Sequence, residues 1–211
     1  MRRSDAETIA AHYDHLAPEY DQRWMRYVQE EASWVIDQWP ESIHRGLALD
    51  LGCAAGTLLA ALRRRQPQLL LAGVDLSPAM LDQARARAPE AHFMTGDIED
   101  PDFVATLPRA EVVLSLSLLH HLRNVNGHLQ LLHDLVKPGG VVFLADFAVD
   151  GLVMRLAERY FRVRHPYHRT ALSHRDLRAR LDRRFPPEAT RCAILRPDHF
   201  WRIQIFRLSR A

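Results

Sequence analysis

The stretch LDLGCAAGTL, residues 49–58, joins an apolar run to a turn of small residues and then to a second apolar run. Gly52, Ala54 and Gly56 occupy alternate positions in the turn, and Asp50 lies just before it. Small residues let a backbone approach a bound molecule closely, because a larger side chain would collide with that molecule. The pattern predicts a nucleotide-type binding turn after a buried strand. For Ala54 we expect a negative φ angle and therefore a narrower pocket that still admits a ligand.

A second candidate binding residue ends the next apolar run, LLLAGVD, at Asp75. Asp75 comes 19 residues after Gly56, a spacing that suits a carboxylate that binds the two hydroxyl groups of a ribose. A dinucleotide-binding fingerprint would have its third glycine at position 57, where this sequence has the branched Thr57. The two strand ends therefore predict one nucleoside-containing ligand, and the spacing argues against a dinucleotide.

From about Ala48 to Phe147 the sequence resembles class I S-adenosylmethionine (SAM)-dependent methyltransferases of the small-molecule type. The resemblance rests on the turn at residues 49–58 and on the segments DLSPAM, HFMTGDIED, AEVVLSLSLLHHL and LVKPGGVVFLADF. Ala54 departs from the family pattern, which usually has glycine there. The resemblance implies SAM as the cofactor. It also implies an α/β, Rossmann-like sheet of seven strands, mostly parallel with an antiparallel C-terminal strand, and helices on both faces.

The resemblance further implies a set of cofactor-binding residues. These are Asp50, Gly52, Ala54, Gly56, Asp75, Leu76, Met80, Asp97, Ile98, Ser115 and Tyr20. Leu76 and Met80 lie where the family packs apolar atoms against adenine. Asp97 and Ile98 lie where it contacts the adenine amino group and the ring face.

Length and composition are those of a single globular domain. A chain of 211 residues with 47% hydrophobic residues lies within the range that one core serves. No run approaches the ~18 apolar residues of a membrane span, and no apolar run follows the N-terminal arginines as in a secretory signal. We therefore expect a cytoplasmic protein without a membrane partner. Cys53 and Cys192 are the two cysteines, and Cys53 lies inside the predicted turn, so a disulfide framework is not expected.

Charge is unevenly distributed along the chain. Residues 151–211 contain 15 arginines and 5 acidic residues, whereas the first 150 residues are net acidic. Arginine binds carboxylates and phosphates well, which favours an anionic substrate or partner. Alternatively, SHRDLRARLDRRF forms an amphipathic helix that faces water. Nucleic acid is not favoured as the target, because SLSLLHH lacks the acid-or-Asn, Pro-Pro, aromatic signature of amino-base methyltransferases.

Periodicity predicts three segments within one domain of residues 1–211. Residues 1–45 form an N-terminal helical cap, with helix over 5–38 and a break near Ala17-Pro18. Residues 46–150 form the SAM-binding core, with strands at 47–51, 70–75, 91–95, 111–116 and 140–147 and helices at 56–65, 78–87, 101–107 and 125–136. Residues 151–211 form a substrate-covering segment, including a helix that Ser173 caps, and two closing strands. Tyr-Asp pairs such as Tyr20-Asp21 lie over the cofactor in similar enzymes, or else their rings pack on the sheet.

His120 and His121 are the candidate catalytic residues. They follow the fourth strand, at the sheet edge where ligands of open α/β folds bind. Methyl transfer depends mainly on positioning, and a base assists when the acceptor must lose a proton. Neighbouring residues on a helical turn diverge by about 100°, so one of the pair is structural. The resemblance makes His120 the base and His121 the brace; the alternative is that both are hydrogen-bonded scaffold.

His165, Tyr167 and His168 are the candidate substrate-binding residues. They lie in a region that often covers the acceptor in similar enzymes. No metal is expected, because these histidines lack an acidic partner, and Ser115 stands where metal-dependent relatives carry a metal-binding acid.

Three functions remain open at this stage. The first is transfer of a methyl group to O, N or C of a small molecule with aromatic or anionic character. The second is a SAM-binding fold used for a non-methylating biosynthetic step. The third, supported only by the C-terminal arginines, is nucleic-acid binding.

Overall fold

The protein, a computed structural model, is described over residues 5–165, 167–169, 171–197 and 201–211. Over these ranges seven strands form one sheet in the order β3-β2-β1-β4-β5-β7-β6. They are β1 (Gly46–Leu51), β2 (Leu69–Asp75), β3 (His92–Thr95), β4 (Ala110–Leu116), β5 (Val136–Phe147), β6 (Thr190–Leu195) and β7 (Ile203–Ser209). Strands β1 to β5 pair in parallel, and β7 is antiparallel to β5 and β6. The predicted fold class is confirmed.

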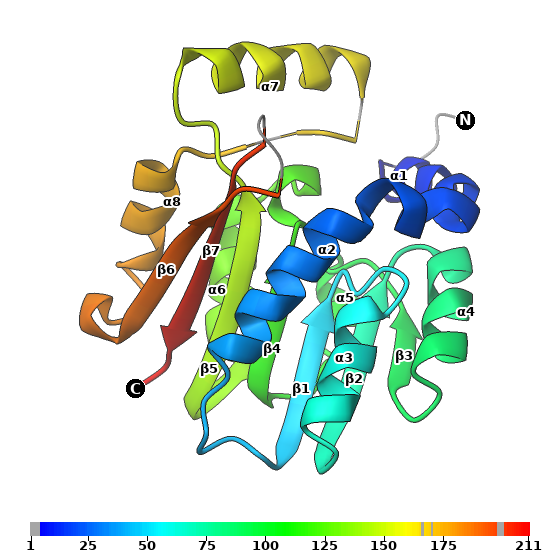
Figure 1. Ribbon diagram of the computed structural model, residues 1–211, viewed down its shortest axis with the longest axis vertical. Helices are drawn as coiled ribbons and strands as arrows, with labels where there is room; N and C mark the ends of the chain where they lie inside the picture. Colours follow the sequence, from blue (N-terminus) through cyan, green and yellow to red (C-terminus); the bar gives the residue numbers. More distant parts are fainter. Residues whose placement is uncertain (1–4, 166, 170, 198–200) are drawn as a thin grey trace.

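Helices cover both faces of this sheet (Figure 1). They are α1 (Asp5–Leu16), α2 (Tyr20–Asp37), α3 (Thr57–Arg65), α4 (Pro78–Arg87), α5 (Pro101–Val104), α6 (Val125–Leu135), α7 (Leu152–Arg164) and α8 (His174–Leu181), with short 3-10 turns η1 (Ala17–Glu19), η2 (Leu119–His121) and η3 (Pro187–Ala189). One apolar cluster joins α2, α3 and α4 to the sheet, and a second joins α6 and α8 to the opposite face.

Strand β1 shows why the sequence gives two apolar layers. Successive side chains of a strand point to opposite faces, so Ala48 packs on the α2 and α3 side and Leu49 on the α6 side. Both are fully buried. A parallel strand covered on both faces needs a continuous apolar run, which is the pattern found in the sequence.

Several predicted boundaries shift by one or more residues. The helix predicted from residue 56 begins at Thr57, because Gly56 has a φ of 73° that a right-handed helix does not accept. The helix predicted over 101–107 ends at Val104, and the strand predicted from residue 140 begins at Val136. The Ser173 cap is confirmed, since its hydroxyl oxygen accepts a hydrogen bond from the Asp176 amide at 3.1 Å.

The break at Ala17-Pro18 folds α1 back over α4, which brings the N-terminal segment to the carboxyl edge of the sheet (Figure 1). Asp14 fixes this position: its carboxylate accepts hydrogen bonds from the Ser77 hydroxyl at 2.6 Å and the Ala79 amide at 3.1 Å. Gln83 donates to the Ala17 carbonyl at 2.6 Å. Across the part of the chain that the structure describes, no helix is long and apolar enough to cross a membrane.

Candidate active site

The turn after β1 has left-handed backbone at each of its three small positions. The φ angles are 77° at Gly52, 45° at Ala54 and 73° at Gly56. The expectation of a negative φ at Ala54 is therefore wrong. The left-handed conformation is unfavourable for alanine, because of its Cβ atom. In this conformation the Ala54 amide donates a hydrogen bond to the carboxylate of Asp75 at 2.9 Å.

Asp75 ends β2 with its carboxylate tied to two loops. One oxygen accepts from the Ala54 amide and the other from the Ser77 amide, each at 2.9 Å. Burial raises the pKa of Asp75, and the Ser77 and Ala54 amides oppose that rise. Each oxygen keeps lone-pair capacity for a further donor, and Asp75 lines a cavity beside the turn.

This cavity has a volume of about 460 Å³ and opens at the carboxyl edge of the parallel strands. It brings together many of the predicted site residues, which are Tyr20, Gly52, Ala54, Asp75, Leu76, Asp97, Ile98 and His121. The remaining cofactor predictions lie elsewhere. Met80 and Ser115 are fully buried and do not line it, and the Ser115 hydroxyl pairs with His128 Nε2 at 2.9 Å.

Gly56 serves packing between helices. An added Cβ atom there would lie 2.9 Å from the Cβ of Ala84 on α4. At this position glycine permits the close approach of α3 and α4.

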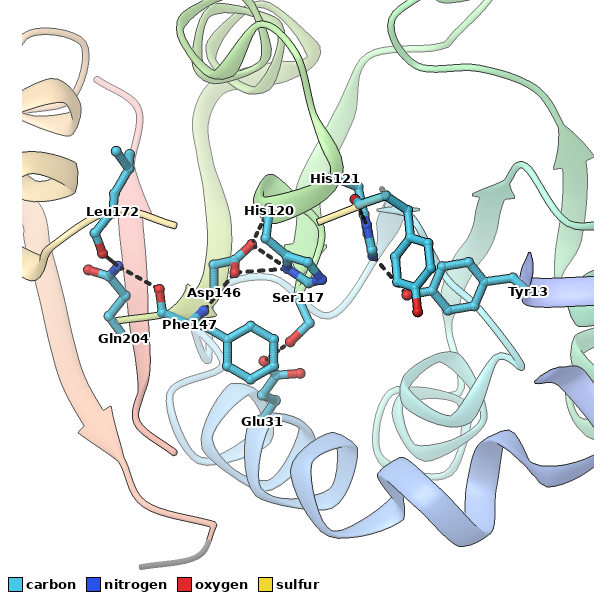
Figure 2. A network of polar contacts seen from close by, with 10 residues as sticks. Tyr13, Glu31, Ser117, His120, His121, Asp146, Phe147, Leu172 and Gln204 are labelled. Atoms are coloured by element: carbon cyan, nitrogen blue, oxygen red, sulfur yellow. Dashed lines mark hydrogen bonds and ion pairs between the residues drawn. The ribbon is translucent and has the colours of Figure 1, made fainter. Parts of the chain in front are cut away.

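Asp50 lines a second, smaller cavity of about 50 Å³ behind the turn, together with Tyr20 and Glu31. Burial raises the pKa of Glu31 to about 8 and that of Asp50 to about 7. Glu31 also accepts a hydrogen bond from the Ser117 hydroxyl at 2.8 Å (Figure 2). Sequence reasoning missed Glu31, although it falls on the buried stripe of α2 with Ala32 and Val35.

His121, and not His120, faces the large cavity. Its Nδ1 lies 2.8 Å from the carbonyl oxygen of Tyr167, so Nδ1 carries the proton and donates. Its Nε2 lies 2.8 Å from the hydroxyl of Tyr13 and accepts from it (Figure 2). Burial, and then the neighbouring His120, lower the pKa of His121 well below its usual value, so the ring is neutral.

His120 is directed toward the end of β5 (Figure 2). Its Nδ1 lies 3.0 Å from a carboxylate oxygen of Asp146, and its amide donates to the other oxygen at 3.0 Å. Asp146 was missed, although it lies next to the end of an apolar strand, much as Asp75 lies at the end of β2. The positions of the two side chains relative to the cavity are the reverse of those expected, because α1 supplies Tyr13 to His121 and β5 supplies a buried acid to His120.

The predicted substrate residues lie beside this pair. Tyr167 stacks on His12 with 4.0 Å between ring centroids, and its hydroxyl pairs with His165 Nδ1 at 2.8 Å. The ring of His168 lies 5.3 Å from that of His120, and burial lowers the pKa of His168 to about 4. None of the three lines the cavity, so they form an aromatic layer behind His121. Within the described ranges no cluster of His, Cys, Asp and Glu is suited to hold a metal ion.

Two arginines line the cavity near α1. Arg123 and Arg169 each form a salt bridge with Asp5, the first residue of α1. The hydrogen bond from Arg169, together with contacts from Arg123, holds the pKa of Asp5 below its usual value. Nε of Arg169 is buried with no hydrogen-bond partner among the described residues. This arrangement has no signal in local sequence, because its members are 118 and 46 positions apart.

The arginines of the basic C-terminal third are partly used in local contacts. Arg178 pairs with Asp182 at 2.7 Å, and Arg180 donates to the side chain of Asn126 at 2.8 Å. Leu177 and Leu181 of the same helix are fully buried. Helix α8 is therefore an amphipathic helix packed on the sheet.

Known proteins share this α/β fold and part of this sequence. A family described as a methyltransferase domain matches residues 49–142. The magnesium protoporphyrin IX methyltransferase of Synechocystis with bound SAM superposes with a TM-score of 0.71 at 16% identity, covering 100% of this chain and 99% of that one. A methyltransferase in complex with the Trm112 activator of Haloferax volcanii gives a TM-score of 0.72 at 17% identity, with 94% and 98% covered.

Curated relatives match part of the chain. Carboxy-S-adenosyl-L-methionine synthase of Wolinella succinogenes is 33% identical over 129 residues, 55% of this chain and 51% of that protein. Trans-aconitate 2-methyltransferase of an Enterobacter species is 41% identical over 81 residues, 35% of this chain and 32% of that protein. The chain thus spans about half or less of their lengths. Residues 49–142 thus match a methyltransferase domain, and solved methyltransferases, one of them with bound SAM, share the fold of this chain.

Proposed function

We propose that this protein transfers the methyl group of SAM to a small-molecule acceptor that carries an anionic group. The observation that carries the proposal is one cavity lined by Asp75 at the end of β2, by His121 after β4 and by Arg169. A carboxylate suited to bind ribose, a neutral histidine and a guanidinium group thus line the same cavity. A cavity of about 460 Å³ lies within the usual range for small-molecule sites.

The residues present fit the adenosyl part of SAM. Asp75 is suited to accept hydrogen bonds from the two ribose hydroxyls, and Asp97 from the adenine amino group. Leu76 and Ile98, which follow these acids, line the same cavity and supply apolar surface for the ring. The left-handed turn at Gly52 brings the backbone close to the side chain of Leu118. A Cβ atom at position 52 would lie 2.9 Å from a methyl carbon of Leu118.

SAM, when bound, supplies a methyl group already activated by a positively charged sulfur. The chain therefore needs chiefly to orient the acceptor, to exclude water and to hold a proton where the acceptor releases one. Tyr13 and His121 provide the proton path: Nε2 of the neutral His121 accepts from the Tyr13 hydroxyl, which also lines the cavity. Helices α1 and α2 contribute residues to the cavity wall, and Arg169 comes from the segment after β5.

Arg169 and Arg123 support an anionic acceptor. Both already bind a carboxylate, that of Asp5, at the cavity wall. A substrate carboxylate presents the same chemistry to the same guanidinium groups. Trans-aconitate 2-methyltransferase, a relative whose name specifies a carboxylate acceptor, agrees with this assignment.

The test begins with calorimetry of the whole chain with SAM and with its demethylated product. Binding of neither ligand at micromolar concentration would refute the proposal. Mass spectrometry with methyl-labelled SAM and a panel of paired acids and amides then identifies the acceptor. We expect labelled product from acids and a raised KM for Arg169→Gln. Arg45→Gln should leave the KM unchanged, because Arg45 directly precedes β1 and its side chain pairs with Gln68.

A second candidate function is a SAM-consuming step that transfers no methyl group. It is favoured by the similarity to carboxy-S-adenosyl-L-methionine synthase over 55% of this chain. The same mass spectra separate the two functions. A cofactor product heavier than SAM, with every acceptor unlabelled, supports the second function, whereas a labelled acceptor with the demethylated cofactor supports the first.

A further inference from the structure

Helix α7 has a continuous apolar stripe on its outer side. The stripe consists of Leu152, Val153, Leu156, Tyr160 and Val163, which are 73%, 65%, 61%, 57% and 81% exposed. At about 100° per residue, these five side chains fall within a sector of about 100°. Met154, on the opposite side, is buried. The helix thus packs on the protein by its inner side and presents apolar side chains outward.

Arginines border the stripe on both sides. Helix α7 contains four arginines and one acid, and all four arginines are exposed. Helical geometry places Arg159 about 20° outside one edge of the stripe and Arg164 about 20° outside the other. Arg155 lies further round beside Arg159. The acid, Glu158, is 3.6 Å from Arg162 and lies away from the stripe.

We propose that α7 is a docking helix that lies in the headgroup layer of an anionic lipid surface. An apolar stripe with Arg155 and Arg159 on one side and Arg164 on the other matches such a surface, because the apolar side chains enter the acyl boundary and the guanidinium groups bind phosphates. A second copy of this chain fits less well, since its arginines would meet these arginines. The 13-residue helix measures about 20 Å, too short to span a bilayer.

The sequence-based expectation of no membrane partner rested on the absence of a spanning run. An interfacial helix needs no such run, because its apolar residues occupy one side only. Figure 1 shows α7 beyond the carboxyl edge of the sheet, on the side of the candidate active site. Its inner residue Phe161 contacts His165 and His168, with ring centroids 5.5 and 6.1 Å apart. Docking would therefore hold the aromatic layer of His165, Tyr167 and His168 near the lipid surface, whether or not the protein transfers methyl groups.

Vesicle flotation of the full chain tests the proposal. We expect binding to phosphatidylcholine vesicles that contain phosphatidylglycerol and little binding to phosphatidylcholine alone. The double variant Leu156→Glu with Val163→Glu should lose binding. The matched control is Leu70→Glu on β2, where an apolar side chain is 69% exposed far from α7, and it should bind as the unchanged protein does.

Neutral substitutions of the arginines test the same binding without placing a new negative charge on α7. Arg155→Gln and Arg159→Gln should weaken binding about fivefold each, and added salt should weaken it further. Failure of the unchanged protein to float with anionic vesicles overturns the proposal. A loss of vesicle binding in the Leu70→Glu control as large as that in the double variant also overturns it. A dimer in sedimentation velocity that dissociates in the double variant, without vesicle binding, would assign the stripe to a second copy instead.

Discussion

Replacing Gly56 by alanine should destabilise the protein in two ways, by backbone strain and by a steric clash with Ala84, and a control variant separates the two effects. The φ of 73° costs an L-residue about 1–2 kcal/mol. The new Cβ atom would also lie 2.9 Å from the Cβ and 3.0 Å from the Cα of Ala84, a buried position where overpacking costs about 1–3 kcal/mol. The total is about 2–5 kcal/mol, and at about 2–4 °C per kcal/mol the Tm should fall by about 4–20 °C.

Gly139→Ala is the matched control for this experiment. Gly139 has a nearly equal φ of 75°, but a Cβ atom there meets nothing within 4 Å among the described residues. Only the backbone cost of about 1–2 kcal/mol applies, so its Tm should fall by about 2–8 °C. Thermal unfolding by circular dichroism measures both variants. Equal decreases would refute the argument that close approach of α3 and α4 requires glycine at position 56.

Three further predictions concern residues of the two cavities. Asp75→Asn should weaken SAM binding about 10- to 150-fold in calorimetry, because a hydrogen bond to a charged acceptor contributes about 1.5–3 kcal/mol. Glu31, with a pKa raised from 4.5 to about 8, holds a proton that the unfolded chain releases, so stability should fall as the pH rises from 5 to 8. Glu31→Gln should flatten that slope in thermal unfolding at several pH values, and an unchanged slope would contradict the assignment. Tyr13→Phe should reduce kcat with little effect on the Kd for SAM, since it removes the donor to His121 Nε2 and leaves the cavity wall intact.

The parts of the site that local sequence predicted are those on the strand ends. Gly52 and Asp75 were predicted because a turn and an acid after apolar runs have a fixed place at the carboxyl edge of a parallel sheet. The sign of φ at Ala54 was predicted wrongly, because it depends on a hydrogen bond to Asp75, 21 positions away. Propensity alone favours a negative φ for alanine, and the tertiary contact overrides it.

The parts that sequence did not predict come from the segments that fold over the sheet. His121 faces the cavity because α1 supplies Tyr13, which is 108 positions away, and His120 turns to Asp146 on β5. Neither partner is visible in the stretch around the two histidines. The salt bridges of Asp5 likewise depend on where α1 lies, which the periodicity of a helix does not specify.

The charges around the β1 turn favour a ligand that carries positive charge. Asp50, Glu31 and Asp75 are all buried near this turn, and mutual repulsion adds to burial in raising the pKa of Asp50 and of Glu31. No salt bridge among the described residues joins any of the three to a basic side chain. Buried carboxylates without a cation are costly, whereas a ligand with positive charge offsets that cost as it binds. SAM carries a sulfonium and an ammonium group, so under the proposed function its binding, unlike that of a neutral nucleoside, would neutralise this end of the site.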